Sequence, residues 1–583
     1  MFEGKDETVK ITIDGQEVRV PQDYSILRAA ETIQVKIPHL CYHPTLCAEG
    51  NCRVCAVAVE GARTPVVASC VYPVSEGMIV RTNTPEVREV RKNVVELMLA
   101  SHPRDCLLCP RNGDCELQQV AAELGIREIA FDGERRKPEK DLGNPAICRD
   151  LEKCILCTRC VRVCSERQGL GIYATNYRGF DSVVEPAFGL GLNEVACTYC
   201  GQCAAVCPTA ALTEKDDTQA LWDVLSDPDK HVIVQTAPAV RVALGEAFGM
   251  PPGSIVTGRM VAALRRMGFD RVFDTAFTAD LTVMEEGYEL LYRIQTGGVL
   301  PQITSCSPGW VNYVETRHPE IIPNLSTAKS PQAMFGAVAK SYYAEREGLD
   351  PARIVCVSVM PCTAKKAEAA REELCTDGRR DVDIVVTTRE FARMIKEAGI
   401  DFRSLPNEDF DAPMGISSGS GRIFGATGGV REAALRMSYE AYTGRTLERI
   451  EFHEIRGLEG IKEAEVDFGG GLVLKVAAVH TLRNAEKLAE EVQSGTSKYH
   501  FIEVMACPGG CIGGGGQPYA RDEATLKARM EALYEGERQM RYRKSHENPA
   551  IVELYETWLG VPLGEKSHEL LHTHYTPQKE RIW

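Results

Sequence analysis

Two segments, CILCTRCVRVC at residues 154–164 and CTYCGQCAAVCP at residues 197–208, decide how the first part of this chain folds. Each contains four cysteines spaced C-x2-C-x2-C-x3-C, so the chain carries an internal repeat. In such a run, three thiolates grip one face of a [4Fe–4S] cube and the turn directs the fourth toward a second cube. A zinc-binding knot is the alternative. The repeat predicts two crossed ligand sets, Cys154, Cys157, Cys160 and Cys207, and Cys197, Cys200, Cys203 and Cys164.

Cysteine usage along the whole chain also indicates metal binding. The 583 residues include 23 cysteines, most of them in short-spaced clusters. A disulfide framework is typical of small secreted chains, not of a long chain without an export signal. The doubled run with Pro208 is similar to that of bacterial ferredoxins, which favours iron–sulfur cubes over zinc.

Composition narrows the function classes. The formal net charge of −15 disfavours nucleic acid as a partner, because an acidic surface repels phosphates. No apolar run reaches about 18 residues, so no membrane insertion is predicted. The start, residues 1–7, is too polar for a secretory signal, so we expect a cytoplasmic protein. The length predicts several domains.

A β-hairpin and a first metal site are predicted at the start of the chain. Apolar and polar residues alternate over residues 9–13, and Asp14-Gly15 supplies the turn. The set that follows resembles the [2Fe–2S] site of plant-type ferredoxins, with looser spacing, and structural zinc is the alternative. Its members are Cys41, Cys52, Cys55 and Cys70. We expect Cys47 to be a packing residue.

A compact set of cysteines and one histidine follows a predicted helix from Val87 to Met98. Its spacing is H-x3-C-x2-C-x5-C, and three thiols with one imidazole indicate zinc about as readily as an iron–sulfur cluster. The charged stretch 132–140 separates this zone from the double-cube repeat. The members of the set are His102, Cys106, Cys109 and Cys115.

The pattern changes after about residue 220. Val232–Val234, Ile354–Val359 and Ile384–Val386 are predicted buried strands, and Met260–Met267 and Arg389–Ala398 are predicted amphipathic helices. Alternation of strands and helices predicts an α/β domain with a largely parallel sheet.

Three cysteine peptides in this domain have glycine- or proline-rich surroundings. They read TSCSPGW at 304–310, MPCTAKKAE at 360–368, and EVMACPGGC at 503–511, which IGGGGQP follows. Cysteines from separate loops can converge on a metal, and glycines allow the backbone to approach a bulky cofactor. Lys365 can offer charge-assisted hydrogen bonds to an anionic ligand.

The order of these sites resembles a known family. A two-iron module, a module with one histidine and three cysteines, and a double-cube module are shared by iron-iron hydrogenases and the large iron–sulfur subunit of respiratory complex I. In both, the histidine ligates a [4Fe–4S] cluster. The three C-terminal peptides resemble the hydrogenase signatures TSCCPxW, MPCxxKxxE and ExMACxxGCxxGGG. The chain is thereby identified as a member of the iron-iron ([FeFe]) hydrogenases.

The resemblance implies a multidomain α+β and α/β protein, with ferredoxin-like iron–sulfur modules before a two-lobed α/β hydrogenase domain. It implies one [2Fe–2S] cluster, three accessory [4Fe–4S] clusters, and an H-cluster made of a [4Fe–4S] cube and a di-iron unit with CO, cyanide and a dithiolate. The expected domains are 1–80 ([2Fe–2S]), 81–130 (histidine-ligated [4Fe–4S]), 140–215 (double [4Fe–4S]), 220–520 (catalytic) and 521–583 (a small-subunit-like segment).

The resemblance also implies residue roles at the H-cluster. The cube ligands are expected to be Cys362, Cys507 and Cys511, with Cys511 bridging to the two irons. Lys365 is expected to hydrogen-bond a cyanide. The residues expected to lie against the cofactor are Met360, Met505, Pro238 and Ser307.

A proton relay is implied as well, through Cys306, Glu286, Ser326 and Glu289. Without the resemblance, the pair Glu286 and Glu289 would be interpreted as part of a solvated helix face, because residues three apart share one face.

The chain departs from the signatures at two positions. Ser307 stands where the family has the cysteine that ligates the cube. Three alternatives follow: Ser307 ligates through oxygen, Cys306 takes over the bond and its relay role is displaced, or the cluster is altered. Ala239 stands where a serine often donates to cyanide, so one hydrogen bond is missing.

The expected function is reversible oxidation of H2 and reduction of protons, with electrons carried through the N-terminal clusters. The overall form resembles the catalytic subunit of multimeric, often electron-bifurcating, NAD(P)-linked hydrogenases. The implied partners are flavin- and iron–sulfur-containing subunits that react with NAD(P)H, and ferredoxin. The alternatives are a stand-alone ferredoxin-dependent hydrogenase, a complex I-like electron-transfer subunit without hydrogen chemistry, and a sensor or cluster-assembly protein.

Overall fold

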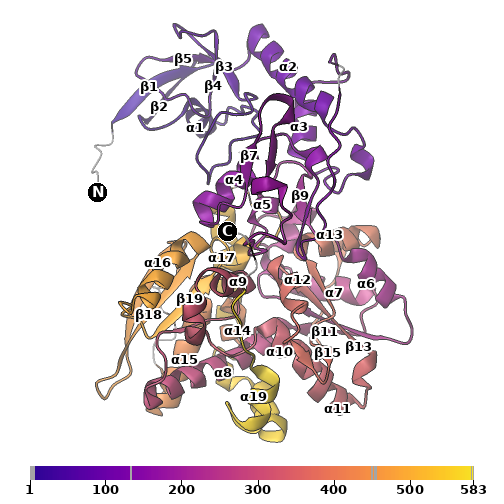
Figure 1. Cartoon of the computed structure of the whole chain (residues 1–583), viewed down its shortest axis with the longest axis vertical. Helices are drawn as coiled ribbons and strands as arrows, with labels where there is room; N and C mark the ends of the chain where they lie inside the picture. Colours follow the sequence, from indigo (N-terminus) through magenta and orange to yellow (C-terminus); the bar gives the residue numbers. More distant parts are fainter. Residues whose placement is uncertain are drawn as a thin grey trace.

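The computed structural model describes residues 7–131, 134–447, 451, 456–520, 522–578 and 581. The polar start at residues 1–6 and the first two residues of the charged stretch, Asp132 and Gly133, lie outside the described residues. The N-terminal modules form one end of the molecule, and a larger two-lobed domain forms the other (Figure 1). Within the described ranges, every helix is too short or too polar to traverse a lipid bilayer.

The first module is a small sheet built on the predicted hairpin, which is confirmed. Strands β1 and β2 pair antiparallel across a turn in which Asp14 has φ 48° and Gly15 has φ 84°. Val9, Ile11 and Ile13 are buried, as period-two alternation requires. The strand order is β2-β1-β5-β3-β4. The elements are β1 (Thr8–Ile13), β2 (Gln16–Pro21), α1 (Ile26–Thr32), β3 (Ala56–Val59), β4 (Val66–Ala68) and β5 (Ile79–Arg81).

The next two modules consist of short elements around cysteine-rich loops. The predicted helix at Val87–Met98 lies inside α2, which Thr84 caps by accepting a hydrogen bond from Val87 N. The elements of the second module are α2 (Pro85–Ser101), η1 (Cys106–Leu108) and α3 (Glu116–Glu123). Those of the third are β6 (Ile147–Arg149), α4 (Arg159–Arg162), η3 (Val163–Arg167), β7 (Ala174–Asn176), β8 (Val183–Glu185), α5 (Gln202–Ala205) and β9 (Leu212–Glu214).

The large domain has two lobes, each built on a four-stranded sheet. The first sheet, in the order β11-β10-β13-β16, is parallel throughout, which confirms the predicted parallel strands. In the second, β12-β19-β18-β17, only the edge strand β17 runs antiparallel. The strands are β10 (His231–Thr236), β11 (Arg271–Asp274), β13 (Ile354–Met360), β16 (Ile384–Thr387), β12 (Gln302–Ile303), β17 (Ile461–Asp467), β18 (Val473–His480) and β19 (Phe501–Met505).

Helices cover both sheets and fill the space between the lobes (Figure 1). The predicted amphipathic helices correspond to α7 and α13, and α13 begins with a capping box between Thr387 and Glu390. The helices that the site uses are α7 (Thr257–Arg266), α8 (Thr275–Thr296), α9 (Pro308–Arg317), α10 (Pro331–Val338), α12 (Ala364–Ala369), α13 (Thr388–Glu397) and α15 (Gly429–Thr443). The last segment contains α17 (Glu523–Arg538), α18 (Pro549–Leu554), η15 (Tyr555–Leu559) and α19 (Glu565–Leu571).

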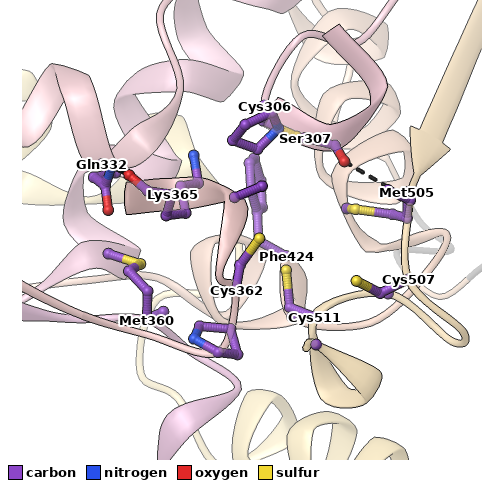
Figure 2. A pocket seen from close by; sticks show the side chains of 18 of the residues that line it. Cys306, Ser307, Gln332, Met360, Cys362, Lys365, Phe424, Met505, Cys507 and Cys511 are labelled. Atoms are coloured by element: carbon purple, nitrogen blue, oxygen red, sulfur yellow. Dashed lines mark hydrogen bonds between the residues drawn. The ribbon is translucent and has the colours of Figure 1, made fainter. Parts of the chain in front are cut away.

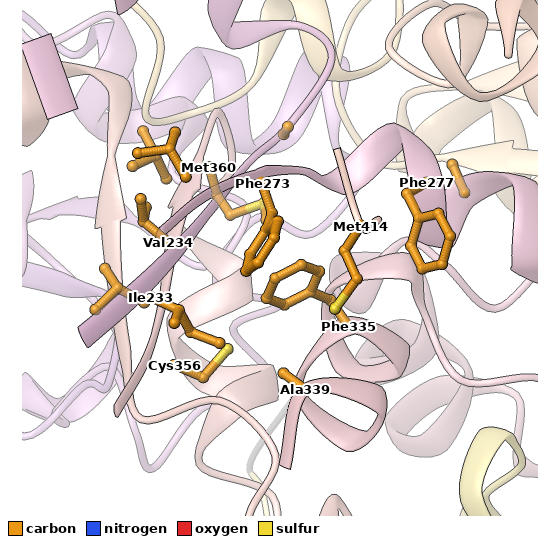
Figure 3. Close-up of a cluster of buried hydrophobic side chains, with 14 of the residues drawn as sticks. Ile233, Val234, Phe273, Phe277, Phe335, Ala339, Cys356, Met360 and Met414 are labelled. Carbon is orange, nitrogen blue, oxygen red and sulfur yellow. The ribbon is translucent and has the colours of Figure 1, made fainter. Parts of the chain in front are cut away.

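The largest hydrophobic cluster anchors the first lobe. Phe273 on β11 and Phe335 on α10 pack with ring centroids 5.8 Å apart, and Met414 and Met360 complete the contact (Figure 3). Full burial of such a side chain contributes roughly 1.5–3 kcal/mol each. This packing fixes α8 and α10 against the sheet, and both helices carry residues of the site.

Candidate active site and iron–sulfur sites

A cavity of about 80 Å³ lies where strands from both lobes end, and all three cysteine peptides line it. Met360 is the last residue of β13, Met505 is the last residue of β19, and Cys306 lies between β12 and α9. The carboxyl ends of parallel strands are where α/β sheets place their ligand sites. Figure 2 shows side chains from these separate loops directed into one space.

Three of the expected ligand thiols meet in this cavity. Cys362, Cys507 and Cys511 all line it. Burial raises the pKa of all three thiols, and neighbouring thiols add to the rise for Cys507 and for Cys511, whose pKa reaches about 12. Buried thiols that oppose one another's ionisation become thiolates only where a metal supplies positive charge. The donor set therefore fits a metal cluster.

Glycines allow the third peptide to close this cavity. Gly510 has φ 91°, and a Cβ there would lie 2.8 Å from Thr427 N. A Cβ on Gly514 would lie 2.2 Å from Pro361 O, and one on Gly515 would lie 2.4 Å from Cys200 O. The backbone of this glycine run therefore packs directly on the second peptide and on the double-cube module, where no side chain would fit.

Lys365 lies on α12 at the cavity wall. Its ion pair with Glu368 was not among the contacts expected from the sequence. Its Nζ donates to Glu368 Oε1 and Oε2 at 3.0 and 2.8 Å. Glu368 also accepts from Ser330 Oγ at 2.9 Å and from Gln332 Nε2 at 3.0 Å. The i, i+3 spacing of Lys365 and Glu368 is the sequence signal that could have identified this pair.

Other expected cofactor neighbours also line the cavity. Met360 and Met505 are both buried, so each packs in the hydrophobic core and also contributes to the cavity wall. Pro238 lines it from the end of β10. Gln332 and Phe424 line it as well, and no sequence pattern pointed to them; Gln332 Oε1 is buried without a hydrogen-bond partner.

Electrostatic effects and one hydrogen bond link the four expected relay residues, and Cys306 among them lines the cavity. Cys306 lines the cavity, and the charge of Glu286 acts on its thiol, whose pKa burial raises well above the ordinary range. Burial, and then the charge of Glu289, raise the pKa of Glu286 to about 8. The Ser305 backbone and the Ser326 hydroxyl partly offset this rise, and Ser326 Oγ donates to Glu289 Oε2 at 2.6 Å. Both glutamates are buried on α8, so the interpretation as a solvated helix face is wrong.

Cys306 and Ser307 face different neighbours. After the desolvation effect, the groups that act on the Cys306 thiol are Glu286 and Lys365. Ser307 Oγ instead accepts a hydrogen bond from Ala506 N at 3.2 Å, next to Cys507 (Figure 2). The serine hydroxyl therefore lies on the side of the third peptide.

The structure brings the predicted double-cube ligands together in their crossed sets. Cys154, Cys157, Cys160 and Cys207 line one small cavity. The charges of Cys200, Cys197 and Cys164 act together on the thiol of Cys203. In each set, three cysteines of one run therefore meet the last cysteine of the other run.

The thiols of the first module also converge. Cys41 shares side-chain hydrogen bonds with Cys52 and Cys70, and Cys55 shares one with Cys70, so the pKa values of Cys41 and Cys55 are lowered. Cys47 is exposed, and its backbone N donates to Glu166. The expectation that Cys47 is a packing residue is therefore wrong.

The histidine set occupies consecutive turns between α2 and α3. His102 directly follows α2, Cys106 begins η1, Cys109 follows η1, and Cys115 precedes α3. Burial lowers the pKa of His102 to about 4, so its ring is neutral at pH 7, and its buried Nδ1 has no hydrogen-bond partner. A buried, unpartnered imidazole nitrogen fits a metal ligand. Among the residues that the structure describes, Cys109 acts on the thiol of Cys115, whereas the charged groups that act on His102 are Lys153, Asp105 and Asp150.

Buried arginines join the modules to the double-cube region. Arg162 donates to Cys41 O at 2.6 Å and to Cys157 O at 3.2 Å. Arg111 donates to Cys207 O at 3.1 Å. At the other end, Cys200 lines the catalytic cavity itself. Each candidate cluster site therefore lies next to another candidate cluster site or to the cavity.

Fold and sites together define an iron–sulfur oxidoreductase in which a row of cluster sites leads to a buried, cysteine-lined cavity. The chain belongs to the iron-only, or [FeFe], hydrogenase family. Residues 230–515 match the family described as iron only hydrogenase large subunit, C-terminal domain, and residues 522–578 match the iron hydrogenase small subunit. Upstream, residues 6–85 match a 2Fe-2S iron-sulfur cluster binding domain, 91–130 the NADH-ubiquinone oxidoreductase-G iron-sulfur binding region, and 153–211 a 4Fe-4S dicluster domain.

Individual relatives agree with this assignment. The chain is 52% identical to the NADP-reducing hydrogenase subunit HndD of Solidesulfovibrio fructosivorans, over 97% of this chain and 98% of the relative. It is 40% identical to iron hydrogenase 1 of Clostridium pasteurianum, over 97% and 99%. The solved structure of apo [FeFe]-hydrogenase HydA1 from Chlamydomonas reinhardtii is similar with 46% identity and a TM-score of 0.57, covering 63% of this chain and all of that one. The chain is thus a hydrogenase with N-terminal iron–sulfur domains.

Proposed function

We propose that this hydrogenase is the hydrogen-converting subunit of a multisubunit NAD(P)-linked enzyme. The observation that carries the proposal is 52% identity over 97% of the chain to a subunit named as NADP-reducing. The match of residues 91–130 to a region of NADH-ubiquinone oxidoreductase supports it. The partners would be flavin- and iron–sulfur-containing subunits that react with NAD(P)H, with ferredoxin as a further carrier if the enzyme bifurcates electrons. A pyridine-nucleotide partner would place the protein in the cytoplasm.

We propose one [2Fe–2S] cluster, three accessory [4Fe–4S] clusters and one H-cluster. Cys41, Cys52, Cys55 and Cys70 would hold the first, His102 with Cys106, Cys109 and Cys115 the next, and the two crossed sets the double cubes. Cys362, Cys507 and Cys511 would hold the cube of the H-cluster. When bound, the di-iron unit supplies the chemistry that splits or forms H2.

The contacts between modules support a branched electron path. Arg162 bridges the loop of Cys41 to that of Cys157, and Arg111 bridges the histidine module to Cys207. Both outer modules would therefore pass electrons to the first cube. The second cube, beside the catalytic cavity through Cys200, would connect the path to the H-cluster.

For proton movement, we propose the order Cys306, Glu286, Ser326, Glu289. The raised pKa of Glu286, about 8, keeps this carboxyl mostly protonated at neutral pH, so that it can act as a proton donor. Ser326 Oγ donates to Glu289 Oε2 and also acts on the Glu286 carboxyl, so one hydroxyl can connect the two glutamates. Lys365, held by Glu368, would donate hydrogen bonds to an anionic ligand of the cluster.

We further propose that Ser307, not Cys306, takes the fourth corner of the H-cluster cube. Ser307 Oγ lies within hydrogen-bond distance of Ala506 N, beside the ligand loop of Cys507. The charges of Glu286 and Lys365 act on the Cys306 thiol, and this environment suits a proton donor. An oxygen ligand is harder than a thiolate and favours the more oxidised irons.

Two measurements test the function. Infrared spectra of the anaerobically matured protein should show intrinsic CO and cyanide bands. Affinity purification from the native host should recover a flavoprotein that reduces NAD(P) with H2 only when this chain is present. A chain that purifies alone and turns over ferredoxin at full rate without any partner would favour the stand-alone alternative.

A further inference from the structure

A chain of hydrogen bonds leaves the outer end of the proposed proton relay and enters the C-terminal segment. Thr327 Oγ1 lies 3.4 Å from Glu289 Oε1 and 2.8 Å from His572 Nδ1. On the other side of the ring, His572 Nε2 lies 3.0 Å from Glu285 Oε2. Glu285 also accepts hydrogen bonds from Tyr555 OH and from Leu563 N.

Backbone pairing fixes this geometry. Ala328 and His572 form an antiparallel bridge. Lys329 N donates to Leu571 O at 2.7 Å, and Thr573 N donates to Thr327 O at 2.8 Å. The C-terminal segment is therefore paired, like a short strand, with the residues that follow Ser326. The His572 ring is held against Thr327 by the main chain and does not depend on side-chain packing alone.

The donors and acceptors along this chain are suited to proton exchange. The Glu285 carboxylate favours the tautomer with hydrogen on Nε2 of His572, so Nδ1 is left as an acceptor. The single hydrogen of the Thr327 hydroxyl can then be donated either to Nδ1 or to Glu289 Oε1. The negative charge of Glu285 offsets the positive charge that the ring acquires when Nδ1 takes a proton. Both side chains are buried, with exposed fractions of 2% and 0%, so bulk water does not compete for these positions.

We propose that His572 exchanges a proton with Glu289 through the Thr327 hydroxyl, so that the C-terminal segment adds an imidazole branch to the proton relay. Protonated Glu289 gives its proton to Thr327 Oγ1 while Thr327 gives its own to His572 Nδ1. Glu289 becomes a carboxylate, the ring becomes an imidazolium, and no electron moves; the reverse step returns the proton. The proposal rests on the role proposed above for Glu286 and Glu289.

Several titratable groups surround the ring and belong to its pH response. Glu285 and, through Thr327, Glu289 face it from α8, and Arg293 of the same helix pairs with Glu289 Oε1 at 2.7 Å. His568 stacks on it from α19, with ring centroids 4.7 Å apart. Tyr555 of η15 acts through Glu285. Because His568 is exposed and stacks without bridging the chain, its replacement serves as a control.

The test compares Thr327→Val with Thr327→Ser in the matured holoenzyme, with H2 evolution from reduced methyl viologen measured from pH 5.5 to 8.5. Valine keeps the shape and removes the hydroxyl, whereas serine keeps the hydroxyl. We expect Thr327→Val and His572→Gln to lower the rate about threefold to tenfold and to change the pH profile in the same way. Thr327→Ser and His568→Gln should retain the wild-type profile.

Two outcomes distinguish failure of the branch from failure of the relay. If Thr327→Val and His572→Gln keep the wild-type profile while Glu286→Gln abolishes turnover, the branch is wrong and the relay stands. If Glu286→Gln also has no effect, the relay itself fails, and the branch fails with it. Iron content and thermal melting report on folding; if His572→Gln is unstable, Thr327→Val decides the question alone.

Discussion

The double-cube module and the catalytic cavity use the same ligand chemistry but are built in different ways. The module takes all its cysteines from residues 154–207, on turns next to α4 and α5. The cavity takes its three thiols from the ends of β13 and β19, strands of different lobes. Local spacing is therefore enough to place the first set, whereas the second exists only when both lobes are packed together. A mutation in the cavity should therefore abolish H2 turnover without disturbing the clusters of the N-terminal modules.

The largest effect is expected for Cys511→Ser. Loss of a ligand in the cavity should abolish H2 turnover, by more than about 100-fold, while the N-terminal clusters keep their electron paramagnetic resonance signals. Cys356→Ala is the matched control, because Cys356 is a buried cysteine of β13 that does not line the cavity. Loss of the N-terminal signals in Cys511→Ser would show that the two regions are not separable in this way.

Glu286→Gln is expected to come next, with a loss of about 10²- to 10⁴-fold in H2 evolution, because the amide does not relay a proton. In the wild type, the pKa of Glu286 is raised to about 8, so the carboxyl keeps its proton up to that pH. The rate of evolution should therefore fall as the pH rises through about 8. Glu286→Asp, which keeps a carboxyl, should be intermediate. An unchanged rate in Glu286→Gln would remove this residue from the relay.

Ser307→Cys should change spectroscopy more than rate. A thiolate in place of the serine oxygen favours the reduced irons more, so the midpoint potential of the H-cluster cube should rise. Activity should stay within about tenfold of the wild type, because the proton relay is untouched. Spectroelectrochemistry measures the shift, and Ser307→Ala is the companion variant. Identical potentials in all three proteins would mean that residue 307 does not ligate the cube.

The smallest effect is expected at the contact between the two regions. Gly201 has φ 68°, and a Cβ there would lie 2.3 Å from Thr363 Oγ1, which donates to Tyr199 O. Gly201→Ala should lower the free energy of unfolding by about 1–3 kcal/mol. Gly125→Ala is the matched control, because Gly125 has a similar φ of 66° with nothing within 4 Å. Equal melting temperatures for the two variants would contradict a tight junction.

The N-terminal hairpin and the cysteine sets of the double-cube module were predictable from residue patterns that span only a few positions. The hairpin at Asp14-Gly15 followed from alternation and a turn that accepts positive φ, and the crossed cube sets followed from cysteine spacing. The cavity peptides were found by resemblance. The burial of Glu286 and Glu289 was not predictable from α8 alone, because a helix shows its periodicity but not what packs on each face.

The sequence by itself determined which residues carry the chemistry, because thiolate spacing and turn residues act over a few positions of the chain. Only the tertiary structure decided which of them meet: that Ser307 lies beside Ala506, that Ser330 and Gln332 hydrogen-bond Glu368, and that His572 reaches Thr327 from the other end of the chain. Such contacts join residues far apart in sequence, and they depend on the packing of two lobes and a C-terminal segment, which no local pattern encodes.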